Sequence, residues 1–108
     1  MAANYETVNN IVQQYVADVK RVMPIDKAVL YGSYAKGTAT EWSDVDVCFF
    51  SETFAHERSI EILTDLLGIA GKYHSSDVCI EPRAFLTSDI EDDNPFVREV
   101  LRTGREII

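Results

Sequence analysis

The first stretch of the chain carries apolar residues at helical spacing, which predicts one long amphipathic helix. Pro24 fits the end of this helix, because proline stops a helical pattern close to its own position. The apolar positions of the predicted helix are Tyr5, Val8, Ile11, Val12, Tyr15, Val16, Val19 and Val22.

Two more long helices are predicted further along the chain. Apolar residues recur at helical spacing from 60 to 70, and Gly71 follows them as a stop signal. Asn94 followed by Pro95 is a favourable N-cap and first helical position, so the last helix should begin there and end before Gly104. The acidic stretch just before Asn94 is predicted to be a loop or a short irregular turn.

Short apolar runs rich in β-branched and aromatic residues predict the strands. The first strand covers residues 27–31. The second covers 44–50, and its near-continuous apolar character implies burial on both faces of a sheet. A third strand is predicted at 77–80, closed by Pro82 because proline cannot donate a hydrogen bond to a strand ladder. Residues 105–108 would add a final strand at an edge.

The predicted order is helix, strand, short helix, strand, helix, strand, helix, with the short helix at 33–36 stopped by Gly37. Such alternation is typical of a small α/β (α+β) fold, in which a small mixed β-sheet is flanked by helices. The chain of 108 residues is close to the usual size of a domain. We therefore expect residues 1–108 to form a single domain.

Two short motifs mark neighbouring predicted strands. Gly32 and Ser33 follow the first strand at a turn into the short helix, and Asp44 and Asp46 open the second strand. Residues two apart on a strand share a face, so the two carboxylates would lie side by side and repel without a cation between them. Gly32 would let a phosphate approach the backbone, and Ser33 offers a hydroxyl and an N–H at a helix start. A divalent metal that holds a nucleotide triphosphate explains both motifs.

Other interpretations of these residues compete with this one. Asp44 and Asp46 could be solvated side chains at a strand edge, although aspartate is depleted in strands. A calcium loop fits poorly, because apolar residues rather than oxygen ligands follow the pair. A Walker A loop fits poorly as well, since Lys36 precedes Gly37 instead of following a glycine. Lys36 could contact a phosphate or be a solvated surface lysine.

The two motifs together resemble the signature of the nucleotidyltransferase superfamily, which includes DNA polymerase β and the aminoglycoside nucleotidyltransferases. That signature is Gly-Ser, about ten residues and then Asp-x-Asp, and here it is formed by Gly32-Ser33 with Asp44 and Asp46. The resemblance implies the nucleotidyltransferase (polymerase β palm-like) fold. It implies that ATP or another NTP lies along Gly32, Ser33 and Lys36, with two Mg²⁺ ions on the aspartates. It also implies in-line attack of an acceptor hydroxyl on the α-phosphate, with pyrophosphate leaving.

The length of the chain points to the minimal nucleotidyltransferases, small domains commonly encoded beside a HEPN partner in toxin–antitoxin pairs. The resemblance is specific over residues 28–50 and looser towards the C-terminus. It implies an antitoxin that transfers AMP to a tyrosine or similar hydroxyl of a HEPN-type toxin. Two alternatives stay open: the catalytic subunit of a small-molecule (aminoglycoside-type) nucleotidyltransferase, and a non-catalytic antitoxin that acts by binding alone. The retained carboxylates weaken the second alternative.

A site with two metal ions usually needs a third carboxylate, which must come from a neighbouring strand. The run from 77 to 82 resembles the strand that carries it in this superfamily. Asp77 and Glu81 would share a face but lie about 13 Å apart at the strand rise, so both cannot serve one site. We favour Asp77, because it opens its strand as Asp44 opens the second one. The resemblance gives this carboxylate the role of general base or of a metal ligand.

The composition of the chain limits the cellular compartments and the kinds of partner that fit this protein. Eighteen acidic and ten basic residues give a net charge of −8, which argues against an extended nucleic-acid surface. No apolar run approaches the ~20 residues needed to span a bilayer, and the N-terminus lacks a signal-peptide pattern. The two cysteines lie inside apolar runs and are expected to be reduced core residues. These features predict a cytoplasmic protein that does not act at a membrane, and they leave homo- or hetero-oligomers open.

Overall fold

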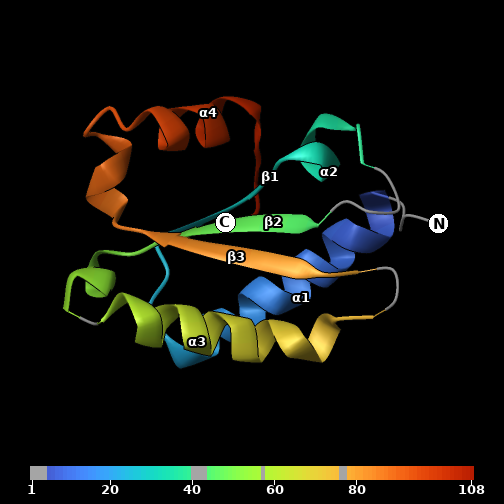
Figure 1. The fold of residues 1–108 in the computed structure, drawn as a ribbon, viewed down its shortest axis with the longest axis horizontal. Helices are drawn as coiled ribbons and strands as arrows, with labels where there is room; N and C mark the ends of the chain where they lie inside the picture. The colour runs from blue at the N-terminus through green and yellow to red at the C-terminus, as the bar shows by residue number, and fades with distance from the viewer. Residues whose placement is uncertain (1–4, 40–43, 57, 76–77) are drawn as a thin grey trace.

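The fold is that of a computed structural model, which describes residues 5–39, 44–56, 58–75 and 78–108. Helices, strands and short 3₁₀ segments follow one another along the chain (Figure 1). In chain order they are α1 (Tyr5–Val22), β1 (Lys27–Tyr31), α2 (Ser33–Lys36), β2 (Val45–Phe50), η1 (Glu52–His56), α3 (Ser59–Ala70), η2 (Gly71–Tyr73), β3 (Ile80–Phe85), η3 (Thr87–Ile90), α4 (Pro95–Thr103) and β4 (Arg105–Glu106).

Four strands form one mixed sheet in the order β3-β2-β1-β4. β1 is antiparallel to both of its neighbours, β2 and β4, whereas β2 and β3 are parallel. Figure 1 shows α1 and α3 together on one face of the sheet and α4 on the other. This mixed sheet flanked by helices confirms the predicted fold class.

The larger core lies between the sheet and the pair α1 and α3. Val45, Val47 and Phe49 of β2 belong to it, together with the inward side chains of both helices. Tyr15 is fully buried there, with its ring centroid 5.5 Å from that of Phe49. Its hydroxyl donates a hydrogen bond of 2.9 Å to the carbonyl oxygen of Leu66. Because a buried hydroxyl needs a partner, this bond fixes α1 against α3.

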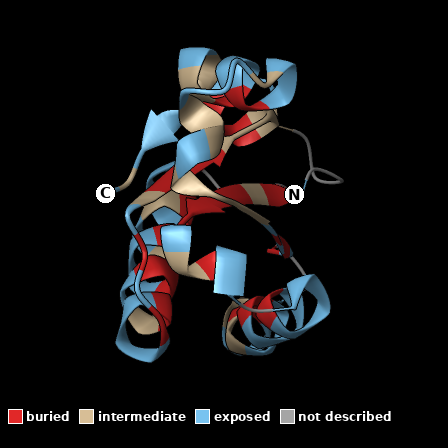
Figure 2. Cartoon of the chain, turned by 90° about the vertical axis from the view of Figure 1, so that its left-hand side faces the viewer, coloured by how far each residue is buried: buried red, intermediate tan, exposed pale blue. Residues whose placement is uncertain are grey.

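A smaller core fills the opposite face of the sheet, beneath α4. Val29, Cys48 and Phe50 of the sheet pack there against Val97 and Val100 of the helix. β2 is therefore buried on both faces over most of its length, as its apolar sequence predicted. Figure 2 shows the exposed positions on the outer sides of the helices and the buried ones towards the sheet.

The start of α4 follows the predicted cap. The Asn94 side chain accepts hydrogen bonds from the backbone N–H groups of Phe96, at 2.9 Å, and Val97, at 3.2 Å. Gly104 follows the helix where the chain turns into β4. A Cβ added at Gly104 would lie 2.9 Å from the carbonyl oxygen of Leu30 and closer still to the backbone of the helix, so a glycine fits this tight turn.

The third strand differs from the prediction of residues 77–80. β3 runs through Pro82 instead of ending at it. The N–H of Val45 donates to the carbonyl of Cys79, and that of Ser51 donates to the carbonyl of Phe85. Odd-numbered residues of β3 therefore bond to β2, while Pro82 turns its backbone to the outer edge, where no N–H is required.

The cysteines also depart from expectation in one respect. Cys48 is buried, as predicted, but Cys79 is exposed just before β3, and both are free thiols. Within the described part of the chain, no helix combines the length and the apolar character needed to cross a membrane.

Candidate active site

Three polar side chains lie next to one another across three strands of the sheet. Tyr31 of β1 pairs with Asp46 of β2, and Asp46 pairs with Glu81 of β3. Directly paired residues point to the same face. Cys48 lies two positions after Asp46 and packs in the core beneath α4, so the three polar residues occupy the continuation of the α4 face. Asp44 lies just before β2 and is exposed.

The carboxylates at this end of the sheet act on one another. Burial, together with the charges of Glu81 and Asp44, raises the pKa of Asp46 to about 6. Burial also raises the pKa of the Cys79 thiol, with added contributions from Asp44 and Glu81. Like charges that oppose ionisation of their neighbours must be close in space. The structure therefore brings Asp44, Asp46 and Glu81 into one acidic cluster.

The Gly-Ser turn touches this cluster through its glycine. Gly32 has φ of +76°, a conformation that favours glycine. A Cβ added at Gly32 would lie 3.4 Å from Cγ of Asp46 and well inside contact distance of Oδ2. The Gly32 carbonyl accepts the Lys36 N–H at 3.1 Å, which starts α2 directly after Ser33. Ser33 directly follows Gly32 and is partly buried, and Lys36 is exposed.

Arg83 is a functional candidate that sequence reasoning missed. Its guanidinium lies over the Phe96 ring of α4, 5.4 Å from the centroid, and it lowers the pKa of the Tyr31 hydroxyl. Burial and the charge of Asp46 raise the pKa of Tyr31 to about 12, while Arg83 opposes that rise. Arg83 also opposes the rise at Asp46. Its position two residues after Glu81, on the same face of a strand, was the available signal.

The structure brings together only some of the site residues that the sequence predicted. Gly32, Asp44, Asp46 and the alternative third acid Glu81 lie together, whereas Asp77 falls outside the residues that the structure describes. Over the described ranges, no group of three or more His, Cys, Asp or Glu side chains could hold a metal ion by itself. The donors still suit a divalent cation. The carboxylates around the half-buried Asp46 repel one another, and a bound positive charge would reduce that repulsion.

A Gly-Ser turn that contacts a paired-aspartate strand of a small mixed sheet defines a site of the nucleotidyltransferase class. The sequence comparison agrees with this geometry. The chain belongs to the nucleotidyltransferase domain family, whose profile matches residues 10–102. It is a transferase of this family, as its sequence predicted.

The chain is similar to a curated protein and to a solved structure, both from archaea. The chain is 32% identical over 108 residues to "Putative protein adenylyltransferase MJ1305" of Methanocaldococcus jannaschii, covering 94% of this chain and 71% of that protein. A crystal structure of a "putative nucleotidyltransferase" from Sulfolobus solfataricus superposes with a TM-score of 0.54 at 17% identity. That alignment covers 82% of this chain and 74% of the other, and at such low identity it supports the fold alone.

Proposed function

We propose that this nucleotidyltransferase transfers AMP from ATP to a hydroxyl of a partner protein in a Mg²⁺-dependent reaction. The observation that carries the proposal is the contact between the Gly32 turn and the half-buried carboxylate of Asp46. A phosphate chain at the turn and a cation at the aspartate would be direct neighbours there. The name of the M. jannaschii relative supports a protein as the acceptor and an adenylyl group as the cargo.

The nucleotide would lie on the turn between β1 and α2. Gly32 has no side chain to block the approach of a phosphate, and the Ser33 N–H and hydroxyl are donors for it. Lys36 is exposed at the end of the four-residue α2 and would add a positive charge to the triphosphate. These three residues bind and orient the substrate in our proposal.

The acidic cluster would hold the metal. Asp44 and Asp46 would serve as ligands, and we propose Glu81 as the third carboxylate in place of Asp77, because β3 pairs Glu81 with Asp46. When bound, two Mg²⁺ ions would neutralise phosphate charge and lower the barrier to attack at the α-phosphorus. Arg83 lies beside the same carboxylates and would hold Tyr31 and Phe96 in position.

The transfer step requires one bond to form and one to break. The acceptor oxygen forms a bond to the α-phosphorus of ATP, and the bond from that phosphorus to the bridging oxygen of pyrophosphate breaks. Glu81 accepts the proton of the acceptor hydroxyl as general base. The products are the AMP-modified acceptor and pyrophosphate, so no oxidant or reductant is needed.

The resemblance to minimal nucleotidyltransferases supports a HEPN-type toxin as the acceptor and an antitoxin role for this chain. A tyrosine hydroxyl of that toxin would receive the AMP, and the cytoplasm would be the place of reaction. The catalytic subunit of an aminoglycoside-type enzyme is the second candidate. Transfer of label from α-³²P-ATP to a HEPN protein, compared with transfer to an aminoglycoside, distinguishes the two.

Calorimetry of ATP binding tests the proposed site before any acceptor is known. We expect ATP to bind with Mg²⁺ and to lose most of its affinity in EDTA, since phosphates and carboxylates repel each other without a cation. Asp46→Asn should weaken the binding, whereas Asp65→Asn, on the exposed side of α3, should not. Equal affinity with and without EDTA would contradict the metal-dependent site.

A further inference from the structure

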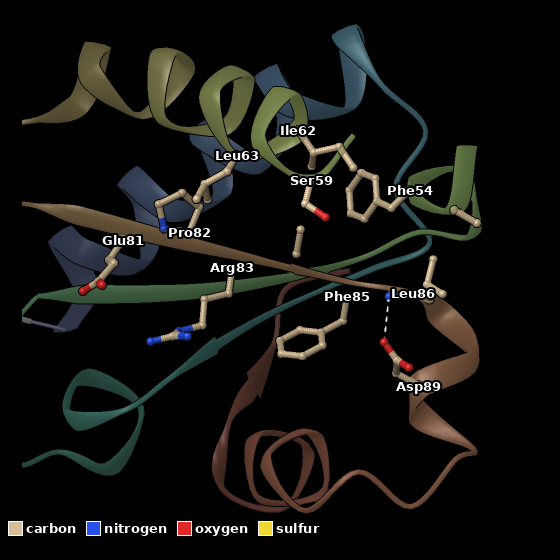
Figure 3. Close-up of a pocket in the computed structure, with 12 residues that line it drawn as sticks. Phe54, Ser59, Ile62, Leu63, Glu81, Pro82, Arg83, Phe85, Leu86 and Asp89 are labelled. Atoms are coloured by element: carbon tan, nitrogen blue, oxygen red, sulfur yellow. Dashed lines mark hydrogen bonds between the residues drawn. The ribbon is translucent and has the colours of Figure 1, made fainter. Parts of the chain in front are cut away.

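A groove of about 540 Å³ runs along the outer edge of β3. Figure 3 shows that Glu81, Arg83 and Phe85 point to one side of the strand, while Pro82 faces Leu63 on the other. The groove begins at Glu81, which belongs to the acidic cluster, and it ends near Asp89. It therefore leads out of the candidate active site along the sheet.

The walls of the groove are apolar and partly exposed. Phe54 of η1 and Ile62 and Leu63 of α3 line one side, and Leu86 lines the end. Leu63 is 40% exposed in spite of its apolar side chain. An exposed apolar wall beside an active site is a common feature of surfaces that bind other molecules.

The backbone of β3 offers hydrogen-bonding groups to an occupant. The backbone N–H and C=O groups of the even-numbered residues point to the outer edge, because those of the odd-numbered residues hydrogen-bond to β2. Both ends of this edge have partners: the Ile80 carbonyl meets the His74 ring at 3.2 Å, and the Leu86 N–H donates to Asp89 at 3.0 Å. Between them lie the Pro82 carbonyl and both backbone groups of Ala84, which hydrogen-bond to nothing among the described residues.

We propose that this groove binds an extended segment of the acceptor polypeptide, added as a short strand beside Ala84, with the acceptor hydroxyl at the Glu81 end. The inference rests on the proposed protein adenylyltransferase function. A groove that starts at the proposed general base would deliver a hydroxyl directly to it. Three available backbone groups suit one extended segment of about the length of β3, which is six residues.

The far end of the groove specifies the charge of the occupant. Asp89 lies there, and Asp26 and Glu52 are joined to the same η3 segment. The Asp26 carboxylate accepts the Thr87 hydroxyl at 2.6 Å, and Glu52 accepts the N–H of Ser88. Asp89 in the groove lining, with two further carboxylates hydrogen-bonded to the adjoining η3 segment, favours a basic residue in the acceptor segment. The occupant is thus a segment with a hydroxyl residue at one end, apolar side chains between and a basic residue at the other.

The test uses two defined peptides on the whole chain: acetyl-Tyr-Val-Thr-Val-Thr-Lys amide and its reverse order, acetyl-Lys-Thr-Val-Thr-Val-Tyr amide. Binding is followed by amide chemical shifts of the ¹⁵N-labelled protein in the absence of ATP. We expect one order to bind saturably, with shifts concentrated at Ala84 and the neighbouring groove. A twin peptide with N-methylated backbone amides should bind about tenfold more weakly, because it cannot pair with a strand.

Matched variants locate the binding surface. Leu63→Glu places a charge in the groove wall, while Ile60→Glu places the same charge on an exposed apolar position of α3 outside the groove. Only Leu63→Glu should weaken peptide binding, by about tenfold or more.

Three outcomes would overturn the inference. One is the absence of shifts at β3 with either peptide, and another is equal binding of the N-methylated twin. The third is occupation of the groove by a second copy of the chain, which would appear as a concentration-dependent mass that Leu63→Glu abolishes. Because no nucleotide is present, failure of these tests is distinct from a failure of ATP to bind, which would overturn the proposed function instead.

Discussion

Gly32 and Asp46 lie in such close contact that no other residue type fits the glycine position without displacing the aspartate carboxylate. A Cβ at Gly32 would lie 3.4 Å from Cγ of Asp46 and nearer still to Oδ2. The turn after β1 and the start of β2 therefore constrain each other. A side chain at this point would occupy the space between the proposed phosphate and metal positions.

Gly32→Ala is expected to abolish Mg²⁺-dependent ATP binding, measured by calorimetry. Gly37→Ala is the matched control, since Gly37 has φ of +77° but nothing within 4 Å of its added Cβ. Both variants should lose about 1–2 kcal/mol of unfolding free energy from the left-handed backbone. Retention of ATP binding by Gly37→Ala would assign the loss at Gly32 to the Asp46 contact. Equal loss in both variants would contradict that assignment.

Asp46→Asn is expected to stabilise the metal-free protein at neutral pH. The pKa of Asp46 is raised to about 6, so ionisation of this carboxyl opposes folding, and that cost is fully present above pH 6. The cost disappears as the pH falls from about 6 towards the usual value near 4, because the folded protein then holds the proton. Urea unfolding in EDTA should show a gain on the order of 1 kcal/mol at pH 7, after allowance for solvent screening, and little at pH 4.

Arg83→Ala is expected to raise the pKa of Asp46 further, because the guanidinium opposes the rise. The carboxyl ¹³C shift of Asp46, followed against pH, measures the change. The loss of the Phe96 and Tyr31 contacts should also cost about 1 kcal/mol of stability. Arg98→Ala serves as the control, because it removes an exposed ion pair between Arg98 of α4 and Asp93, which precedes the helix. An unchanged Asp46 titration in Arg83→Ala would refute the coupling.

Glu81→Gln is expected to lower the rate of AMP transfer by at least ~10²-fold, the usual consequence of losing a general base. ATP affinity should fall much less, because Asp44 and Asp46 remain. The measurement is single-turnover label transfer from α-³²P-ATP at saturating nucleotide. Asp77→Asn is compared in the same assay, since the sequence favoured that residue. A dead Asp77→Asn beside an active Glu81→Gln would restore the original assignment.

Sequence patterns predicted most of the fold because the elements are locally encoded. The bounds of β1 and α2 coincide with the prediction, and α1 and α4 end where proline and glycine indicated. The buried character of β2 also followed from its sequence alone. In each case the periodicity or the stop residue acts over a few neighbouring residues, so no knowledge of the partners was required.

The third strand was misjudged because its length depends on its place in the sheet. Pro82 would interrupt a central strand, but β3 is at the edge and needs no N–H there. Whether a strand lies at the edge or in the centre of a sheet depends on how distant parts of the chain pair with it. A strand that ends at Pro82 also hides the pairing of Asp46 with Glu81, so the sequence argument for Asp77 could not weigh that pairing.

Arg83 and the β3 groove could not be predicted for a related reason. The guanidinium acquires its role from Tyr31 on β1 and Phe96 on α4, which the fold brings to it from both directions along the chain. The spacing of Arg83 from Glu81 places the two on one face of a strand, but it does not reveal which residues of other elements the guanidinium contacts. The groove likewise needs α3 beside β3, an arrangement fixed by packing rather than by local propensity.

The parallel pairing of β2 with β3 determines when the proposed site is completed during folding. All of α3 lies between Asp46 and Glu81 in the chain, so the two acids meet only after a slow, long-range loop closure. The β1–β2 hairpin, by contrast, can form early from adjacent segments. A chain still emerging from the ribosome would hold the Gly32 turn and Asp46 together, and in our proposal it could not transfer AMP until the crossover from β2 through α3 to β3 has docked.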